Sequence, residues 1–144
     1  MKLDCHPIGQ FTGEFQKNSS LYLNINGYAF RHCWNDTWEV CEEWFIRYPE
    51  SVIGLTPLVT FPGTCELRRV VEKIQLSKII LETDAPYFLP KGGGRHSLMG
   101  HTSRDFSVPI HAVNVAAQIA AIKRCDVKKV LQASRANVKR IYGV

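Results

Sequence analysis

The sequence lacks any long apolar run. Hydrophobic residues make up 45% of its 144 residues and charged residues 22%, as is usual for a globular protein. No uninterrupted apolar segment approaches the roughly 20 residues that are needed to span a bilayer. Residues 1–7 also lack the apolar core of a secretory signal. We therefore expect a protein without a membrane partner.

The sequence also lacks a Cys-x-x-Cys pair, and its five cysteines are an odd number. A complete disulfide framework has an even number, so we expect reduced thiols and a cytoplasmic or nuclear location. No serine lies in a Gly-x-Ser-x-Gly turn, which argues against a Ser–His–Asp hydrolase. The net charge of +5 permits an anionic partner, although such an excess is as often a solubility feature.

The chain divides into a weakly patterned start, residues 1–27, and a well-patterned remainder, residues 28–144. Loop residues dominate the start, around at most one short strand at 21–23. From residue 28 the pattern alternates between strands (28–33, 51–60 and 78–81) and helices (a first ending at Pro49, a second capped by Thr64). Such alternation predicts βα units, and hence a parallel sheet with helices packed outside it.

The C-terminal part is patterned as helices. Ser107 is expected to open a long helix, Asp126 to cap a shorter one, and a last helix around 137–141 to end at Gly143. Asn35 or Asp36 is the expected cap of the first helix, whose stripe of large side chains from Trp38 to Tyr48 is typical of a core face.

Two polar residues stand at the ends of predicted parallel strands. His32 lies near the carboxyl end of the first of them, and Asp84 follows the buried run Ile79-Ile80-Leu81. The carboxyl ends of parallel strands lie on the same side of a sheet, where α/β folds place their chemistry. The two side chains can share a divalent metal or form an acid–base pair. Strand ends often carry such residues for structural reasons, so the spacing alone leaves both interpretations open.

Longer motifs around these residues resemble those of one family. The segment 82–90, Glu-Thr-Asp-Ala-Pro-Tyr-Phe-Leu-Pro, resembles the end of the last barrel strand in TatD-related metal-dependent deoxyribonucleases. Arg31-His32-Cys33-Trp34 is similar to their His-Cys-Phe motif, and Ile53-Gly54-Leu55-Thr56 to the strand between the two. The segments 116–120 and 135–143 resemble the closing helices of the family, so the likeness covers residue 28 to the C-terminus.

The resemblance implies an α/β fold of the TIM-type (β/α)8 barrel class, here a partial barrel of about three βα units followed by C-terminal helices. It implies hydrolysis of phosphodiester bonds in DNA with a divalent metal ion, Mg²⁺, Mn²⁺ or Zn²⁺. By resemblance His32 and Asp84 are metal ligands, and Asp84 is also the catalytic group that takes a proton from the nucleophilic water.

The chain also departs from the family pattern. A complete barrel needs about 200 residues or more, and the remaining family ligands, a His-x-His pair, a glutamate and another histidine, are not visible in the sequence. We therefore do not expect these residues to catalyse hydrolysis alone unless another chain or segment supplies the other ligands. Two rivals stay open: a catalytically dead homologue that binds nucleic acid or protein, and an amidohydrolase of a small molecule. An open barrel has to be compensated by oligomerisation, by a second chain or by a rearranged sheet.

A basic loop follows the Asp84 motif. Lys91, Arg95 and Arg104 are candidates for gripping the phosphates of a nucleic acid. A solvated linker explains the same composition equally well. His96 and His101 in this loop lack partners at metal-ligand spacing and are interpreted as surface residues.

Overall fold

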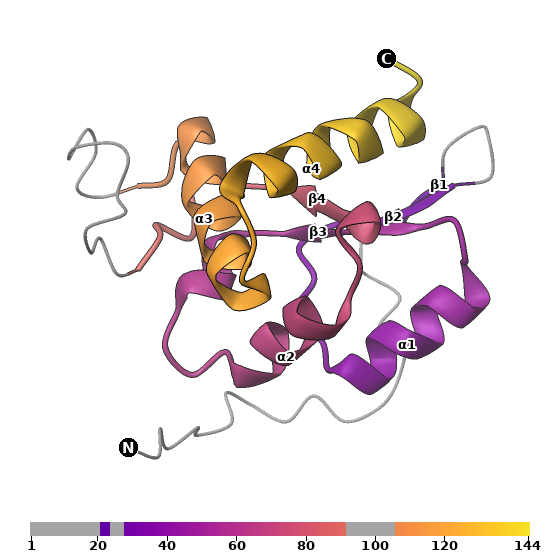
Figure 1. Ribbon diagram of the computed structural model, residues 1–144, viewed down its shortest axis with the longest axis horizontal. Coiled ribbons are helices and arrows are strands. Elements are labelled where there is room, and N and C mark those ends of the chain that lie inside the picture. The colour runs from indigo at the N-terminus through magenta and orange to yellow at the C-terminus, as the bar shows by residue number, and fades with distance from the viewer. Residues whose placement is uncertain (1–20, 24–27, 92–105) are drawn as a thin grey trace.

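In a computed structural model, residues 21–23, 28–91 and 106–144 can be described. Their elements alternate between strands and helices as the sequence pattern predicted (Figure 1). The strands and helices in chain order are β1 (Leu21–Leu23), β2 (Ala29–Arg31), α1 (Trp38–Arg47), β3 (Val52–Leu55), α2 (Cys65–Lys73), β4 (Ile79–Leu81), α3 (Ala112–Lys123) and α4 (Val127–Tyr142). Short 3₁₀ turns occupy Pro57–Thr60, Leu76–Lys78 and Pro109–His111.

The strands form one sheet in the order β1-β2-β3-β4. The pairs β2–β3 and β3–β4 are parallel, and β1 pairs antiparallel with β2. The predicted strand at 51–60 ends at Leu55, because the chain turns into a 3₁₀ helix at Pro57. Three parallel strands with their crossover helices confirm the α/β class and the estimate of about three βα units.

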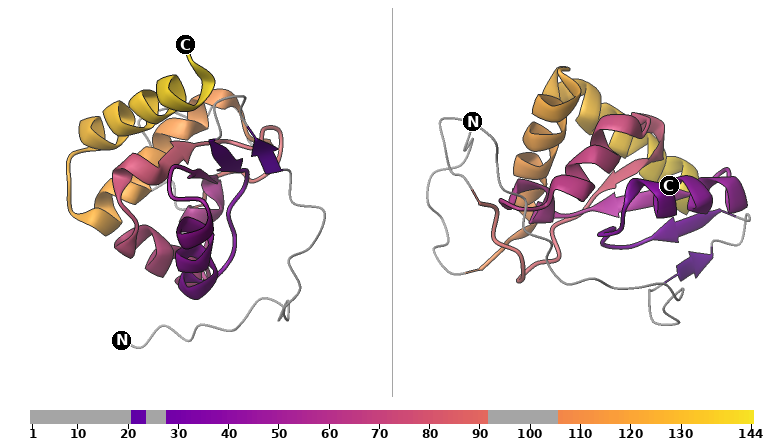
Figure 2. Two further views of the ribbon diagram at one scale, coloured as in Figure 1. Left: turned by 90° about the vertical axis from the view of Figure 1, so that its right-hand side faces the viewer. Right: turned by 90° about the horizontal axis from the view of Figure 1, so that it is seen from below.

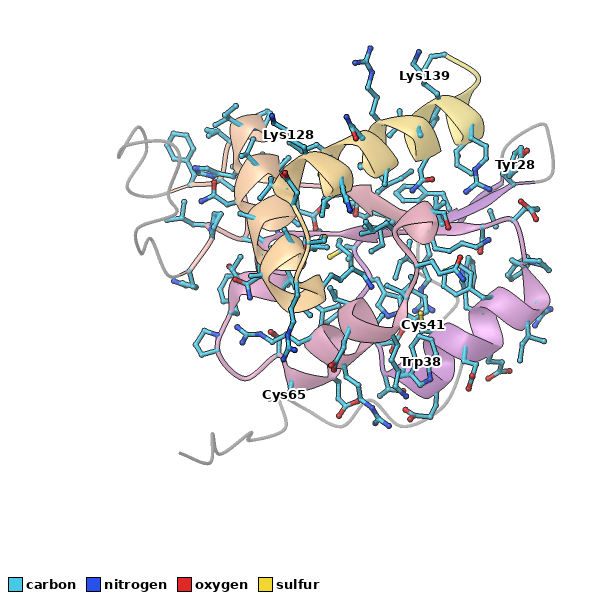
Figure 3. The ribbon with its side chains drawn as sticks, viewed as in Figure 1. Tyr28, Trp38, Cys41, Cys65, Lys128 and Lys139 are labelled. Atoms are coloured by element: carbon cyan, nitrogen blue, oxygen red, sulfur yellow. The ribbon has the colours of Figure 1, made fainter. Side chains whose placement is uncertain are left out.

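One face of the sheet packs against α1, α2 and α3. Ala29, Ile53 and Ile79 come from neighbouring strands and lie in one buried cluster with apolar residues of these helices. The large side chains of α1 belong to this cluster, with Cys41 and Trp44 buried. Figure 3 shows Cys41 between α1 and the sheet. The prediction that the aromatic stripe of this helix is a core face is therefore confirmed.

The opposite face packs against α4. Phe30, Val52 and Ile80 alternate with the residues of the first face and form a second cluster with Ile141 and Val138 of α4. Figures 1 and 2 show α4 on one side of the sheet and α1 with α2 on the other. The face that an open barrel would leave half covered is thus covered by the chain's own last helix.

The free edge of β4 is also closed by α4. Glu82 N–H donates to Leu55 O on β3, so the neighbouring N–H of Leu81 points away from β3. This N–H donates to Ser134 Oγ at 3.0 Å, and Asn137 Nδ2 donates to Ile79 O at 2.8 Å. Ser134 and Asn137 are buried, so α4 satisfies groups that an adjoining strand would otherwise pair.

Asn137 is therefore expected to be a stabilising residue of the fold. Asn137→Asp keeps the shape of the side chain but removes the donor to Ile79 O, and should lower the free energy of unfolding by about 1–3 kcal/mol. Chemical denaturation of the purified chain measures the change. Gln132→Ala, on the exposed side of the same helix, is the matched control and should change stability little. Equal effects of the two substitutions would contradict the role of Asn137.

Several predicted helix ends differ from the structure. Asn35 and Asp36 do not cap α1; Thr37 does, because Asp36 pairs with Arg31 and its carbonyl accepts the indole N–H of Trp34. Ser107 does not open α3, since its N–H donates to Pro86 O and the helix starts after the following 3₁₀ turn. Asp126 and Gly143 cap α4 at its two ends as predicted, but α4 is one helix, where two were expected.

Three cysteines, Cys33, Cys41 and Cys125, are free thiols as expected. Cys65 is disulfide-bonded, which contradicts the expectation that all thiols are reduced. Within the described ranges, every helix is too short or too polar to cross a membrane.

Candidate metal centre

The carboxyl ends of β2 and β4 bring three titratable side chains together. His32 comes one residue after β2, and Glu82 and Asp84 follow β4. The imidazole Nε2 of His32 lies 3.0 Å from Asp84 Oδ1. The prediction that His32 and Asp84 converge at one edge of the parallel sheet is therefore met by the geometry.

Glu82 is the member of this cluster whose role the sequence did not reveal. Its Oε1 lies 2.6 Å from His32 Nδ1, and its Oε2 accepts the backbone N–H of Cys33 at 2.9 Å. One carboxylate thus fixes both the imidazole and the backbone next to it. With Nδ1 bound to Glu82, His32 directs Nε2 at Asp84. The side chains of Glu82 and Asp84 are 13% and 12% exposed, and that of His32 39%.

Gly54 on β3 provides the space for the Glu82 carboxylate. A Cβ added at Gly54 would lie 1.9 Å from Glu82 Oε2 and 2.2 Å from its carboxyl carbon. The backbone carbonyl of Gly54 also accepts the N–H of Trp34 at 2.8 Å. The missing side chain on the central strand is therefore what lets Glu82 reach across to His32.

The backbone is strained at two positions of the cluster. Cys33 has φ +48° and Asp84 has φ +47°, the left-handed region that non-glycine residues rarely adopt. At Cys33 the strained peptide is held by its bond to Glu82. At Asp84 the carbonyl accepts the N–H of Tyr87 at 2.7 Å, which closes a turn. Such strain is typical of functional sites, where the surroundings hold a side chain in a required direction.

The pKa values of His32, Glu82 and the neighbouring Cys33 are all raised. Burial by itself lowers the pKa of His32, but its hydrogen bond to Glu82 and the charges of Glu82 and Asp84 outweigh this, so the pKa is raised. Burial raises the pKa of Glu82, against the lowering by its bonds to Cys33 N–H and His32. Burial and the neighbouring Asp84 raise the pKa of the Cys33 thiol to about 12. Cys33 therefore stays a neutral thiol near pH 7 and is not a nucleophile.

The cluster has the donor set of a metal centre. One ligand atom from each of His32, Glu82 and Asp84 can be chosen so that all lie within 4.8 Å of one another. An imidazole nitrogen with carboxylate oxygens suits Zn²⁺ and Mn²⁺, and carboxylates suit Mg²⁺. A cation on Nε2 of His32 requires that nitrogen without its proton, and the pKa of His32 is raised, so we expect binding to weaken as pH falls.

The predicted basic loop is placed only in part. Lys91 N–H donates to Thr60 Oγ1 at 2.8 Å, and Lys91 Nζ lies 5.5 Å from the ring centre of Phe61. Both contacts are with the segment after β3, on the same edge of the sheet as the candidate metal centre. Arg95 and Arg104, with His96 and His101, lie outside the described residues, so their roles stay predictions.

Comparison with known proteins supports a single family. The family model described as TatD related DNase matches residues 18–143. A human protein named 3'-5' RNA nuclease TATDN2 is 31% identical over 114 residues, which are 79% of this chain and 14% of the relative. The 3'-5' ssDNA/RNA exonuclease TatD of Citrobacter koseri is 30% identical over 81% of this chain and 42% of its own length.

Solved structures show the same fold. A TatD homologue from Escherichia coli, YJJV, superposes with a TM-score of 0.64 at 23% identity, over 80% of this chain and 40% of that one. An uncharacterized amidohydrolase from Saccharomyces cerevisiae gives a TM-score of 0.64 at 15% identity, over 78% and 39% of the two chains. The chain therefore spans less than half the length of these relatives.

Proposed function

The chain belongs to the TatD related DNase family, and from this membership we propose that it serves as a metal-dependent hydrolase of phosphodiester bonds in nucleic acid. The observation that carries the proposal is the contact between His32, Glu82 and Asp84 at the carboxyl ends of parallel strands. This edge of the sheet is where α/β enzymes assemble their active sites.

His32 and Asp84 are the residues that would hold the divalent ion, as the sequence predicted. The donor set fits, since one imidazole nitrogen and the carboxylates come together within reach of a single cation. Glu82 fits the supporting role, because its carboxylate occupies Nδ1 of His32 and leaves Nε2 to face Asp84. When bound, the ion would lower the pKa of a water molecule and offset negative charge on the phosphate.

Residues of the chain would accept the proton of the attacking water. Asp84 is placed to accept the proton that the attacking water loses as its oxygen bonds to phosphorus and the phosphorus–oxygen bond of the leaving group breaks. Glu82, through Nδ1 of His32, fixes the imidazole ring so that its Nε2 faces Asp84 at 3.0 Å. Cys33 contributes its backbone N–H to Glu82, and its protonated thiol takes no part.

The proposed substrate is taken from the names of two relatives. One name mentions RNA, and the other mentions single-stranded DNA or RNA. We extend this to a nucleic-acid strand as the substrate of the present chain, without choosing between DNA and RNA. Lys91, which contacts the segment after β3, and Arg95 and Arg104 further along the sequence are proposed to contact phosphates.

Further ligands are expected from beyond the described residues. Catalytic sites of this kind usually have three protein ligands and an open position, whereas Glu82 is engaged by His32 and Cys33. The chain also covers only 42% of its bacterial relative. A second chain or a longer polypeptide would supply the missing ligands. Without them the chain would be a binding module, which is the rival function.

The test is hydrolysis of end-labelled single strands of DNA and RNA by the purified chain with Mg²⁺, Mn²⁺ or Zn²⁺. Shortened products with at least one metal, and none after chelation, would support the hydrolase and would mean that the purified chain, alone or as an oligomer, supplies every ligand that the reaction needs. Binding of the strands without turnover in any metal would favour the binding module. Hydrolysis of amide substrates in place of the strands would favour an amidohydrolase.

A further inference from the structure

Exposed aromatic side chains gather beside the candidate metal centre. Tyr87 is 71% exposed, Phe88 36% and Phe106 53%, and Ile110 is 42% exposed nearby in the chain. These four residues are half of the large hydrophobic side chains that are exposed among the described residues. A group of exposed apolar side chains close together in the structure indicates a binding surface.

Backbone contacts hold this group next to Asp84. The turn closed by Tyr87 N–H and Asp84 O puts Tyr87 three residues from the candidate ligand. Ser107 N–H donates to Pro86 O at 2.8 Å, and Ser107 Oγ donates to Thr83 O at 3.4 Å. These bonds bring Phe106 alongside the Tyr87 turn although the two are far apart in sequence. Ser107 is fully buried, so the junction is well anchored.

The turn is held in a strained form on both sides of Tyr87. Asp84 has φ +47° and Phe88 has φ +53°. Of the four described non-glycine residues with positive φ, Cys33, Asp84 and Phe88 surround the site, and Arg124 caps a helix. The segment that exposes the Tyr87 ring to solvent therefore has a strained backbone. A turn built from polar residues or glycine would have had a lower conformational energy.

The surface has the chemistry of a single-strand binding site. Aromatic rings that stack on bases combined with cations that contact phosphates are the elements of such sites. Here Lys91 lies at the same edge of the sheet, and the chain carries a net charge of +5. An aromatic surface that docks another protein would not need to adjoin a candidate metal centre.

We propose that Tyr87, with Phe88 and Phe106, forms a platform on which unpaired bases stack, and that it positions the strand at the candidate metal centre. The inference rests on the proposed function and adds that the chain recognises bases as well as phosphates. Because stacking needs an exposed base face, unpaired DNA or RNA fits the platform and a continuous duplex does not.

The experiment compares two strands of equal length and charge, an oligothymidylate and an oligomer of abasic sites, both end-labelled for fluorescence anisotropy. Binding is measured with a chelator present, so that it does not depend on hydrolysis. The wild-type chain is expected to bind the oligothymidylate roughly tenfold more tightly than the abasic strand. An oligouridylate and a blunt duplex serve as further probes, with the duplex bound more weakly than either base-containing single strand.

Substitutions then assign the preference to the platform. Tyr87→Ala should bring the oligothymidylate down to about the affinity of the abasic strand, and Tyr87→Phe should keep the preference because the ring remains. Ile46→Ala, which removes an exposed apolar side chain from the far end of α1, is the control and should change neither affinity. Circular dichroism of each variant checks that it is folded.

Equal binding of the two strands by the wild-type chain, or a preference unchanged in Tyr87→Ala, would overturn the platform. A preference that is lost in Tyr87→Ala while the chain hydrolyses nothing would support the platform and count against catalysis. The experiments can therefore contradict the platform without contradicting the hydrolase, and the reverse.

Discussion

Asp84→Ala is expected to abolish metal-dependent hydrolysis, with a rate at least about 1,000-fold below that of the wild-type chain. The substitution removes both the carboxylate that faces His32 Nε2 at 3.0 Å and the proposed proton acceptor. The rate is measured on an end-labelled single strand at saturating metal. Because Asp84 has positive φ, alanine at this position is also mildly strained, so the folded fraction has to be determined in parallel.

Two further variants separate charge from folding at this site. Asp84→Asn keeps the size of the side chain and tolerates the left-handed backbone, and it should be as inactive as the alanine variant. Glu43→Ala removes an exposed carboxylate from α1 and should leave the rate unchanged. Activity in Asp84→Asn within a few-fold of the wild type would contradict the role of the carboxylate.

Gly54→Ala is expected to disrupt the centre from the neighbouring strand, without touching any proposed ligand. The new Cβ would lie 1.9 Å from Glu82 Oε2, which is far inside van der Waals contact. Glu82 must then leave His32 and the N–H of Cys33, or the strands must shift. We expect a loss of stability of about 1–3 kcal/mol and a loss of metal affinity of about 10- to 100-fold.

The double variant Gly54→Ala/Glu82→Ala tests the cause of that effect. With the carboxylate gone, the alanine at position 54 has room, so the two losses of stability should be far from additive. Denaturation of the wild type, the two single variants and the double variant gives the coupling energy. Additive losses would show that Gly54 matters for a reason other than the space that it gives to Glu82.

Part of the site was predictable because the alternation of strand and helix patterns predicts parallel strands. His32 and Asp84 both follow strands of one parallel sheet, β2 and β4, which places their carboxyl ends on the same side of the sheet with β3 between them. Glu82 was harder to assign. It shares strand parity with Asp84 and Ile80, but its role depends on an absence, the missing side chain of Gly54 on the next strand. The role of Gly54 can be recognised only when the pairing of β3 with β4 is known, because this pairing places Gly54 against the Glu82 side chain.

The last helix shows how tertiary contacts override the apolar pattern. Ser134 and Asn137 interrupt the hydrophobic stripe of α4, a single helix where the sequence pattern predicted two. Both are buried because they bond to the edge of β4, a partner that no local pattern reveals. Arg140 near the end of the same helix pairs with Glu50 and lies over the ring of Tyr28, and Figure 3 shows Tyr28 at that end of α4. Helix α4 thus stands in, over one face and one edge, for the closure that a complete barrel provides.

Binding of Mn²⁺ to the wild-type chain and to His32→Ala, followed by the electron paramagnetic resonance signal of free Mn²⁺, tests most directly whether these residues form a metal centre. The structure predicts one bound ion per wild-type chain, an affinity that falls as the pH is lowered through the titration of His32, and binding at least about tenfold weaker in His32→Ala. Identical Mn²⁺ binding by the two proteins, or none by the wild type, would contradict it.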